Sequence, residues 1–270
     1  MATHNQARML GFLTQDPIVG NLGEEGAEKI FFQIRTTRRA IDGYKGPEFE
    51  DIIIFYDGTD LMSKLKDLKK YDLVDIKGVV NVLITPKKSI CPNCKQEHIK
   101  FNGTSTFIYP ISCIKLDSLA TSRESNADIP EQILKKHYEE VSNQVLLIGK
   151  VASEPEIIDT GRGQACRYML SVDRKYYINT QDEITADFPW IYTFDEQAEW
   201  DEKYLQKGSV ILVDGIMHNG RIDSRVECEN CGTKYTFKDL KSEFIPYSIE
   251  YLSDFKTDED IELEHLVENL

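Results

Sequence analysis

The sequence predicts an all-β protein built from two tandem copies of one five-stranded barrel, with an acidic tail at its C-terminal end. Three observations lead to this fold class: an internal repeat, short strand-like runs that recur in the same order in both copies, and a length of 270 residues. That length accommodates two domains of ordinary size. A hydrophobic content of 41% is enough for packed cores and excludes wholesale disorder.

The repeat is visible as matched residues at a nearly constant offset. Gly11 precedes an Asp-Pro pair, and Gly149 precedes a Glu-Pro pair 138 residues further on. Further matches join Ile52, Ile54, Tyr56 and Asp57 to Trp190, Tyr192, Phe194 and Asp195 at 138, and Gly78, Phe107 and Ile108 to Gly215, Phe244 and Ile245 at 137. Self-similarity of this kind indicates a repeated structural unit. We expect one domain over 1–117, a linker over 118–142, a second domain over 143–253 and a tail over 254–270.

Each copy contains three strand-like runs, a short helical segment and two more strand-like runs. The runs alternate in polarity or are rich in β-branched and aromatic residues, which is typical of strands. The expected strands cover 7–14, 29–37, 51–56, 71–83 and 106–116 in the first copy and 144–151, 166–172, 188–195, 209–217 and 244–252 in the second. The helices are expected over 60–68 and 199–205. Five strands with a helix between the third and the fourth follow the order of the OB-fold.

The segment between the copies combines two patterns. Residues 118–127 are small and polar, as in linkers, and the apolar residues Ile129, Ile133, Leu134 and Tyr138 follow at helical spacing. We expect a short helix that packs on one of the domains, with a solvated, weakly helical linker as the alternative.

The net charge of −14 argues against a simple basic surface for nucleic acid. The charge is uneven, because residues 254–270 contain seven acidic side chains and one lysine, a net −6. No apolar run approaches the 18 residues of a membrane span, and the N-terminus lacks the pattern of a signal peptide. We therefore expect a cytoplasmic protein that makes no membrane contact, in which six cysteines suggest metal or free thiols before disulfides.

Several segments resemble a known family, the bacterial-type single-stranded DNA-binding proteins (SSBs). The second copy is similar over NQVLLIGKVASEPE (143–156) and YLQKGSVILVDG (204–215), and the first copy more weakly over LGFLTQDP (10–17) and KYDLVDIKG (70–78). The resemblance implies OB-folds that pair as in a dimer, and sequence-tolerant binding of single-stranded DNA. Two tandem domains look like the variants in which one chain supplies what is usually a dimer. The sequence departs from the common family pattern in lacking a Gly/Gln/Pro-rich tail linker and in having two CxxC pairs, which suggests a phage or mobile-element homologue.

Aromatic side chains gather on one side of the third strand of the second copy. Because alternate residues of a strand share a face, Phe188, Trp190, Tyr192 and Phe194 are expected to lie together. Sequence-tolerant binding of single strands needs rings on which any base can stack and cations that follow the phosphates. By the resemblance, the family's stacking residues fall on this face. The alternative is that this side of the strand is core.

The matching face of the first copy, Glu50, Ile52, Ile54 and Tyr56, is poorer in rings, so that domain binds DNA weakly or serves mainly in pairing. Basic and aromatic residues follow the second strand of each copy and suit phosphate contact with stacking, or else form a solvated hairpin end. The predicted DNA-contacting residues are Phe31, Arg35, Arg38, Arg39, Tyr44, Tyr56, Arg174, Lys175, Tyr176, Tyr177, Phe188, Trp190, Tyr192 and Phe194.

Each copy carries one CxxC pair between its fourth and fifth strands, Cys91 with Cys94 and Cys228 with Cys231. This spacing is typical of half a zinc site, and a structural zinc ion takes four ligands. We expect one zinc per chain, held by two thiolates from each hairpin across the two domains. Pairs that join between chains, or His98 completing a site in the first domain, are alternatives. Cys113 and Cys166 lie in strand patterns and are expected to be buried free thiols and not ligands.

The acidic tail allows three interpretations: a solvated segment, a competitor of DNA on the chain's own basic groove, or a docking segment for a replication or recombination protein. Its pattern of Ile261, Leu263, Leu266, Val267 and Leu270 among acids favours docking or a short amphipathic helix. The sequence contains no motif for an enzyme. We expect a non-enzymatic protein that binds and protects single-stranded DNA in replication or recombination, as a monomer or homodimer. A scaffold protein and an RNA-binding OB protein are the alternatives.

Overall fold

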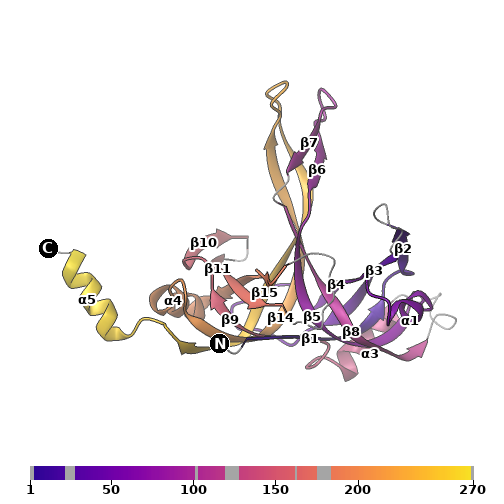
Figure 1. Ribbon diagram of the computed structural model, residues 1–270, viewed down its shortest axis with the longest axis horizontal. Coiled ribbons are helices and arrows are strands. Elements are labelled where there is room, and N and C mark those ends of the chain that lie inside the picture. Colours follow the sequence, from indigo (N-terminus) through magenta and orange to yellow (C-terminus); the bar gives the residue numbers. More distant parts are fainter. Residues whose placement is uncertain are drawn as a thin grey trace.

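The structure is a computed structural model that describes residues 3–21, 28–100, 103–118, 128–161, 163–174 and 184–268 (Figure 1). The elements of the first copy are β1 (His4–Leu13), β2 (Ile18–Asn21), β3 (Glu28–Thr37), β4 (Phe49–Tyr56), α1 (Met62–Lys66), β5 (Asp72–Ile84), β6 (Lys87–Ile90), β7 (Glu97–Lys100) and β8 (Thr104–Ser118). Those of the second copy are β9 (Asn143–Val151), β10 (Glu156–Thr160), β11 (Gly163–Asp173), β12 (Ala186–Asp187), β13 (Trp190–Phe194), α4 (Asp195–Tyr204), β14 (Val210–Glu227) and β15 (Lys234–Ser253). Helices α3 (Asp128–His137) and α5 (Asp258–Glu268) follow the two copies.

Both copies close into five-stranded barrels with the same connectivity. In the first, β1 pairs with β3, β3 with β4, β4 with β8, β8 with β5, and β5 returns to β1. In the second, β9, β11, β13, β15 and β14 form the same ring. The contact between the third and fifth strands is parallel in both barrels, and the others are antiparallel. This arrangement confirms the predicted OB-folds. The domain limits 1–117 and 143–253 stay a proposal.

The two barrels are joined edge to edge by their first strands. β1 and β9 pair antiparallel, from His4 opposite Ile148 to Met9 opposite Asn143. The pairing makes one continuous sheet across the molecule, in the order β15-β14-β9-β1-β5-β8. Every strand edge at this junction is therefore paired, which removes an exposed edge that would invite association with other chains.

The repeated glycines Gly11 and Gly149 lie where the first strand of each barrel turns between two neighbours. A Cβ atom on Gly11 would lie 2.3 Å from the carbonyl oxygen of Arg35, and one on Gly149 would lie 2.4 Å from that of Ser171. Both obstacles are backbone atoms of the second strand, so they move only if the barrel opens. The glycine is thus required by close approach of two backbones.

Replacing Gly149 with alanine should destabilise the second barrel by about 1–3 kcal/mol, the usual cost of overpacking. Urea unfolding followed by circular dichroism measures the change. Gly161→Ala is the matched control, because nothing lies within 4 Å of its Cβ position. Equal stabilities of the two variants would contradict this account of the barrel corner.

A pair of long hairpins extends from the barrels and forms an arm (Figure 1). In the second copy, β14 and β15 pair from Val210 to Glu227, far beyond the predicted strand end at 217, with register shifts after Val210 and after Asp214. In the first copy the same hairpin is divided, and β6 with β7 forms a separate two-stranded sheet. Pro86 lies at the break, and proline cannot donate to the strand ladder. The sequence analysis predicted CxxC-bearing hairpins between the fourth and fifth strands, long ones by the family resemblance, but it gave no limits for β6 and β7 and ended the fourth strand of the second copy at 217.

Helix α3 confirms the predicted helix between the copies and packs on the first barrel. Its Leu134 is fully buried with Leu10, Phe12 and Leu73. Apart from Ser118, the segment 118–127 lies outside the described residues. The acidic tail contains α5, which extends away from the barrels with Leu263, Leu266 and Val267 exposed (Figure 1). None of the helices in the described part of the chain has the length and apolarity needed to cross a membrane.

Candidate nucleic-acid interface and metal centre

The third strands of the two barrels are related by an offset of 137, one residue less than the sequence comparison assumed. Ile54 forms the parallel pair with Ile108 in the first barrel, and Ile191 forms the corresponding pair with Phe244 in the second. Ile108 therefore corresponds to Phe244, and the sequence match of Ile108 with Ile245 is wrong by one residue, as the pairs of Gly78 with Pro110 and Gly215 with Pro246 also show. Ile54 and Ile191 are both fully buried. A slip of one residue moves every side chain of a strand to its other face. The outward-facing equivalents of Trp190 and Tyr192 are therefore Ile53 and Phe55, and the predicted first-copy face of Glu50, Ile52, Ile54 and Tyr56 is wrong.

The outer face of the second barrel combines rings with cations. The guanidinium of Arg167 lies 4.9 Å from the centre of the Trp190 ring, the Nζ of Lys241 lies 4.3 Å from the Tyr192 ring, and the guanidinium of Arg39 lies 3.8 Å from the Tyr247 ring. We call Trp190, Tyr192, Phe194 and Tyr247 with these three cations the ring face. Such cation–ring contacts fall within the usual range of about 6 Å. Arg167, Lys241 and Tyr247 were missed by the sequence analysis.

Part of the ring face is covered by the first copy. Tyr44, in the loop between β3 and β4, packs on Phe194 with ring centres 5.6 Å apart, and it is 4% exposed. Tyr192 and Phe194 are 1% and 6% exposed, in one cluster with Tyr44. The prediction that Tyr44, Tyr192 and Phe194 offer open stacking surfaces is therefore corrected: these rings pack on one another. Trp190 is half-buried and Phe188 is exposed, so their contact with bases stays a prediction.

In the first barrel, the corrected register brings Phe31 opposite Phe55 on the outer face of β3 and β4. Both side chains are half-buried, and the Nζ of Lys29 lies 5.9 Å from the Phe55 ring. Contact of Phe31 with DNA, on this smaller counterpart of the ring face, stays a prediction. Tyr56 does not, because its ring is buried and its hydroxyl oxygen accepts a hydrogen bond from the Leu61 backbone N–H.

The predicted basic residues divide into exposed and engaged groups. Arg39 is exposed. Arg35 is half-buried between Asp51 and Glu131, and Arg38 is buried while donating to three backbone carbonyls. The side chain of Arg174 is 3% exposed and pairs with Asp187. These three guanidiniums hold the protein together, which corrects the expectation that they are open to phosphates. Lys175, Tyr176 and Tyr177 lie outside the described residues.

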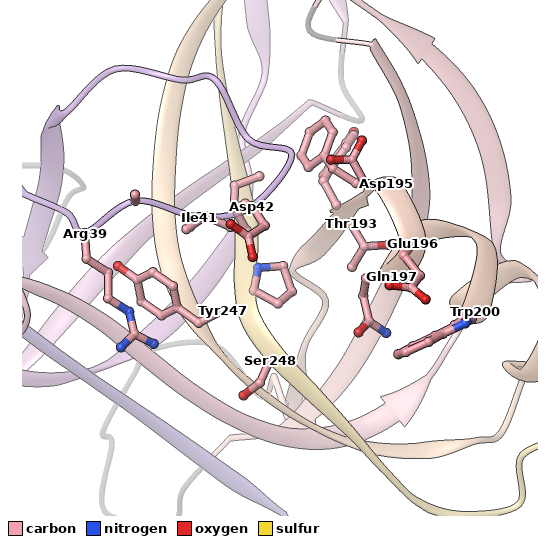
Figure 2. Close-up of a pocket in the computed structure, with 15 residues that line it drawn as sticks. Arg39, Ile41, Asp42, Thr193, Asp195, Glu196, Gln197, Trp200, Tyr247 and Ser248 are labelled. Carbon is pink, nitrogen blue, oxygen red and sulfur yellow. The ribbon is translucent and has the colours of Figure 1, made fainter.

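A cleft of about 480 Å³ lies beside the covered part of the ring face. Figure 2 shows Arg39 and Tyr247 on one side, Trp200 and Gln197 on the other, and Asp42 between them. Its walls come from the β3–β4 loop of the first copy and from β13, α4 and β15 of the second. Trp200 is 48% exposed and faces this cleft. The cleft is thus a feature of the junction and belongs to neither barrel alone.

The junction is fixed by buried polar contacts. The carboxylate of Glu50 lies 2.8 Å from Nδ1 of His218, with both side chains buried. The carboxylate of Asp187 accepts the backbone N–H of Val82 at 2.7 Å. Burial raises the pKa of Glu50 above its ordinary value. Because unpaired polar groups are costly in such surroundings, these contacts fix the relative position of the barrels.

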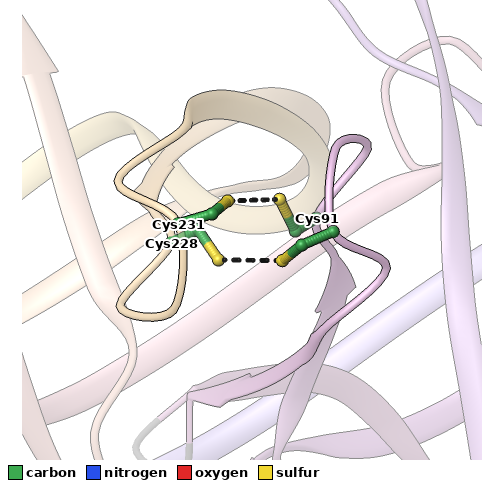
Figure 3. A group of neighbouring side chains, drawn as sticks. Cys91, Cys228 and Cys231 are labelled. Atoms are coloured by element: carbon green, nitrogen blue, oxygen red, sulfur yellow. Dashed lines mark hydrogen bonds between the residues drawn. The ribbon is translucent and has the colours of Figure 1, made fainter.

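The four CxxC cysteines meet at the tip of the arm. Figure 3 shows the two hairpin ends facing one another, with Cys91 Sγ 3.7 Å from Cys231 Sγ and Cys94 Sγ 3.5 Å from Cys228 Sγ. All four sulfur atoms lie within 4.8 Å of one another. Thiolates around a tetrahedral zinc at the usual bond length are separated by about 3.8 Å. The donor set and its spacing therefore fit such an ion, and the predicted meeting of the two CxxC pairs, two cysteines from each hairpin, is confirmed.

Both hairpin ends make the same turn. The backbone N–H groups of Lys95 and Gly232 donate to the carbonyl oxygens of Cys91 and Cys228. Lys95 and Gly232 follow the second cysteine of each pair and have positive φ of 61° and 69°. His98 Nε2 lies 3.1 Å from Cys228 Sγ, beside the four-sulfur group. The alternative in which His98 replaces a cysteine of the other copy is therefore unnecessary.

The thiols differ in acidity. Hydrogen bonds from Thr233 lower the pKa of Cys231 to about 6, and the backbone N–H of Gln96 lowers that of Cys94. Burial raises the pKa of Cys113 and of Cys166 to about 12, so both stay protonated at neutral pH. Burial raises the pKa of Cys228 to about 11, so acidity alone does not set the four clustered cysteines apart. Their suitability for a metal rests on their clustering, because a coordinated thiol is deprotonated by the ion itself. Cys113 and Cys166 lie outside the group, as predicted.

Comparison with known proteins agrees with this geometry. The sequence model of the "Single-strand binding protein family" matches residues 142–241. A relative from Staphylococcus aureus (strain MSSA476), named Single-stranded DNA-binding protein 1, is 33% identical over 119 residues, covering 44% of this chain and 70% of its own. This chain belongs to the single-strand binding protein family. Another family relative, the single-stranded DNA-binding protein of Halalkalibacterium halodurans, is 33% identical over 106 residues, or 39% of this chain and 60% of its own.

Solved structures extend the fold likeness of this SSB-family chain to both copies. The wild-type single-stranded DNA-binding protein of Thermus aquaticus superposes with a TM-score of 0.60 at 16% identity, covering 96% of this chain and 97% of that one. A deletion mutant of the same protein gives 0.59. The family match itself contains β13, Lys241 and the second CxxC pair of this SSB, but not Tyr247.

Proposed function

We propose that this chain binds single-stranded DNA without sequence preference and protects it during replication or recombination. The observation that carries the proposal is the ring face, where three cation–ring pairs surround a cluster of aromatic side chains in a protein of net charge −14. Bases stack on rings whatever their identity, and nearby cations contact the phosphates between them. The Phe31–Phe55 surface of the first barrel supplies a second, weaker contact.

The four clustered cysteines are proposed to hold one structural zinc ion per chain. Cys91, Cys94, Cys228 and Cys231 would be its ligands, and the ion would tie the ends of the two hairpins together. His98 beside Cys228 is suited to donate a hydrogen bond to that thiolate. The arm would then be one rigid element that both barrels share.

The setting of the protein follows from the same proposal. We place it in the cytoplasm, with the CxxC hairpins as the feature that favours a phage or mobile-element source. α5, with exposed apolar side chains among acids, is proposed to dock on a replication or recombination protein. A homodimer of the two-barrel chain is a further proposal, which the sedimentation velocity of the purified protein tests.

A salt series of oligo-dT binding, with duplex DNA alongside and tryptophan fluorescence as the signal, tests the function. We expect quenching, tight binding to dT, weak binding to duplex, and an affinity that falls as salt rises. Absence of binding at low salt, in intact and tail-deleted protein, would instead favour a scaffold protein. A preference for RNA of equal length in competition would favour the RNA-binding alternative.

Trp190→Ala should weaken dT binding by about 1–3 kcal/mol, because it removes an accessible ring of the ring face. Arg167→Ala should weaken it as well and lower the salt dependence, because it removes a cation beside that ring. Lys70→Ala is the matched control, since Lys70 lies over the Tyr71 ring in the first copy, away from the ring face. Loss of binding in the control to the same degree as in Arg167→Ala would mean that charge alone decides, and that the ring face is not the site.

A further inference from the structure

We propose that Tyr44 of the first copy occupies an aromatic subsite for an unpaired nucleobase on the second copy, and that bound DNA displaces it. The inference rests on the proposed binding of single-stranded DNA and adds a base subsite with an intramolecular occupant. In this arrangement Ile41–Tyr44 is a cap over Tyr192 and Phe194. A nucleobase takes the place of the Tyr44 ring when the cap lifts.

The surroundings of Tyr44 indicate a site that suits a flat ring. Its ring lies 5.6 Å from Phe194 at 40° and 5.7 Å from His218 at 68°. Cations stand over the neighbouring rings, with Lys241 beside Tyr192 and Arg39 beside Tyr247. A stacking surface with cations at its border is the combination that single-stranded nucleic acid requires. Tyr44 is the part of this surface that comes from the other copy.

The segment that carries Tyr44 is firmly held at its base. The Arg38 side chain donates to the carbonyl oxygens of Pro47, Arg39 and Gly46 at 2.7 to 2.9 Å, which closes the loop around one guanidinium. Glu50, which begins the following strand, is held by His218. Movement of the tip therefore leaves the junction between the barrels in place.

The tip contacts the second copy through a short segment whose main anchor is the buried Tyr44 ring, and the Arg38 guanidinium lies 4.8 Å from the centre of that ring. The tip is a four-residue turn in which the Tyr44 N–H donates to the Ile41 carbonyl oxygen, with Gly43 at a φ of 72°. Among the described residues, its apolar contact with the second copy comes from Ile41 and Tyr44. Gly43 lies so near Asp195 that a Cβ atom would fall 2.2 Å from the carboxylate oxygen. A short turn of this kind can lift by rotation about a few backbone bonds.

Space for a base already adjoins the covered rings. Tyr192 and Phe194 form part of the wall of the cleft of about 480 Å³, which the exposed Trp200 also lines (Figure 2). Asp42 and Ile41 of the tip close the same cleft from the side of the first copy. Lifting the tip therefore joins the cleft to the face of Phe194 and makes room for a base between rings.

An occupant of this kind lowers the measured affinity, because only the open fraction of molecules binds a base there. Tyr44→Ala removes the occupant and leaves Phe194 accessible. We expect this variant to bind oligo-dT about three- to tenfold more tightly than the unchanged chain. Tyr138→Ala is the matched control, because it removes a half-buried tyrosine that packs with α3 on the first barrel, and its affinity should not change. Phe194→Ala in the Tyr44→Ala background should abolish the gain.

A dT affinity that does not rise in Tyr44→Ala would overturn the inference. Weaker dT binding by Tyr44→Ala would mean that Tyr44 itself stacks on DNA, and unchanged binding would mean that the subsite is not used. If the unchanged chain binds dT but Tyr44→Ala gains nothing, the inference alone fails. If neither protein binds, the proposed function fails with it.

Hydrogen exchange on the unchanged chain tests the displacement of Tyr44 without any variant, so its result does not depend on whether Tyr44→Ala folds. Addition of oligo-dT should speed the exchange of backbone amides over 41–45, including the Tyr44 N–H that is bonded to Ile41. Slower exchange of these amides on addition of dT would mean that the bound nucleic acid stabilises the turn in place, which would contradict the displacement of Tyr44.

Discussion

Cys228→Ser should reduce the zinc content of the purified protein from one ion per chain to near zero. Cys228 is buried beside Cys94 and His98, so its loss leaves three thiolates and removes a ligand that is shielded from water. Binding of structural zinc by four thiolates is worth about 10–16 kcal/mol in small domains, and this is the largest single energy we expect in the molecule. Elemental analysis after dialysis measures the stoichiometry.

The same variant should also loosen the arm without opening the barrels. We expect faster hydrogen exchange over 219–240 and unchanged exchange in β9 and β11, because the ion would join hairpin ends that lie beyond the barrels. Cys113→Ser is the control. The Cys113 thiol lies outside the four-sulfur group, so the variant without it should still contain one zinc ion per chain. One zinc ion per chain in a protein without Cys91, Cys94, Cys228 and Cys231 would rule the site out.

Asp201→Ala should destabilise the second barrel by about 3–5 kcal/mol, since it leaves buried hydroxyl groups without an acceptor. The Asp201 carboxylate is fully buried and accepts hydrogen bonds from Tyr168 and Thr193, at 3.0 and 2.9 Å, and from Gln197 and Tyr251 at 2.8 and 2.6 Å. It ties α4 to the barrel strands on the inner side of β13. The urea midpoint of unfolding measures the loss.

Glu199→Ala is the matched control for this carboxylate, because Glu199 is exposed on the same helix and should change stability little. Burial raises the pKa of Asp201, so the folded chain holds its proton more tightly than the unfolded chain does. The stability contributed by Asp201 should therefore decrease as pH rises from about 4, its unfolded pKa, through its folded pKa. The stability difference between the unchanged chain and Asp201→Ala should narrow over that range. A loss below about 1 kcal/mol at every pH would contradict the network.

The repeat was enough to predict the fold, because residues such as Gly11 and Gly149 are required by close backbone contacts that any closed barrel of this kind makes. The register of the third strand was not predictable at the same level. The matches at 138 and 137 differ by one residue, and only the buried pairs Ile54–Ile108 and Ile191–Phe244 decide between them. This one-residue error in the offset exchanged the inner and outer faces of β4. It therefore selected Tyr56 as a DNA-contacting residue in place of Phe55.

The clustering of the four cysteines was predicted well because CxxC spacing is local in sequence, and two such pairs at equal positions of a repeat can meet when the copies pair. The ring face was predicted in part. The alternation of side chains identified which residues of β13 face outward. It contains no information about a loop from the other copy, so the packing of Tyr44 on Phe194 could not be predicted. Arg167 and Lys241 were missed because they become neighbours of Trp190 and Tyr192 only through strand pairing and close packing.

The pairing of β1 with β9 in one chain has a consequence for the orientation in which a nucleic-acid strand can bind. A dimer of identical barrels presents the same face twice about a two-fold axis, so it treats a nucleic-acid strand alike in either orientation. In this chain the two faces differ, with Trp190, Tyr192 and Tyr247 on one and Phe31 and Phe55 on the other. On the proposed binding, a strand that crosses from one face to the other meets the stronger contacts at one end and the weaker at the other, and its 5′ and 3′ ends become distinguishable. Fusion of the barrels therefore gives the protein a polarity that a symmetric pair lacks.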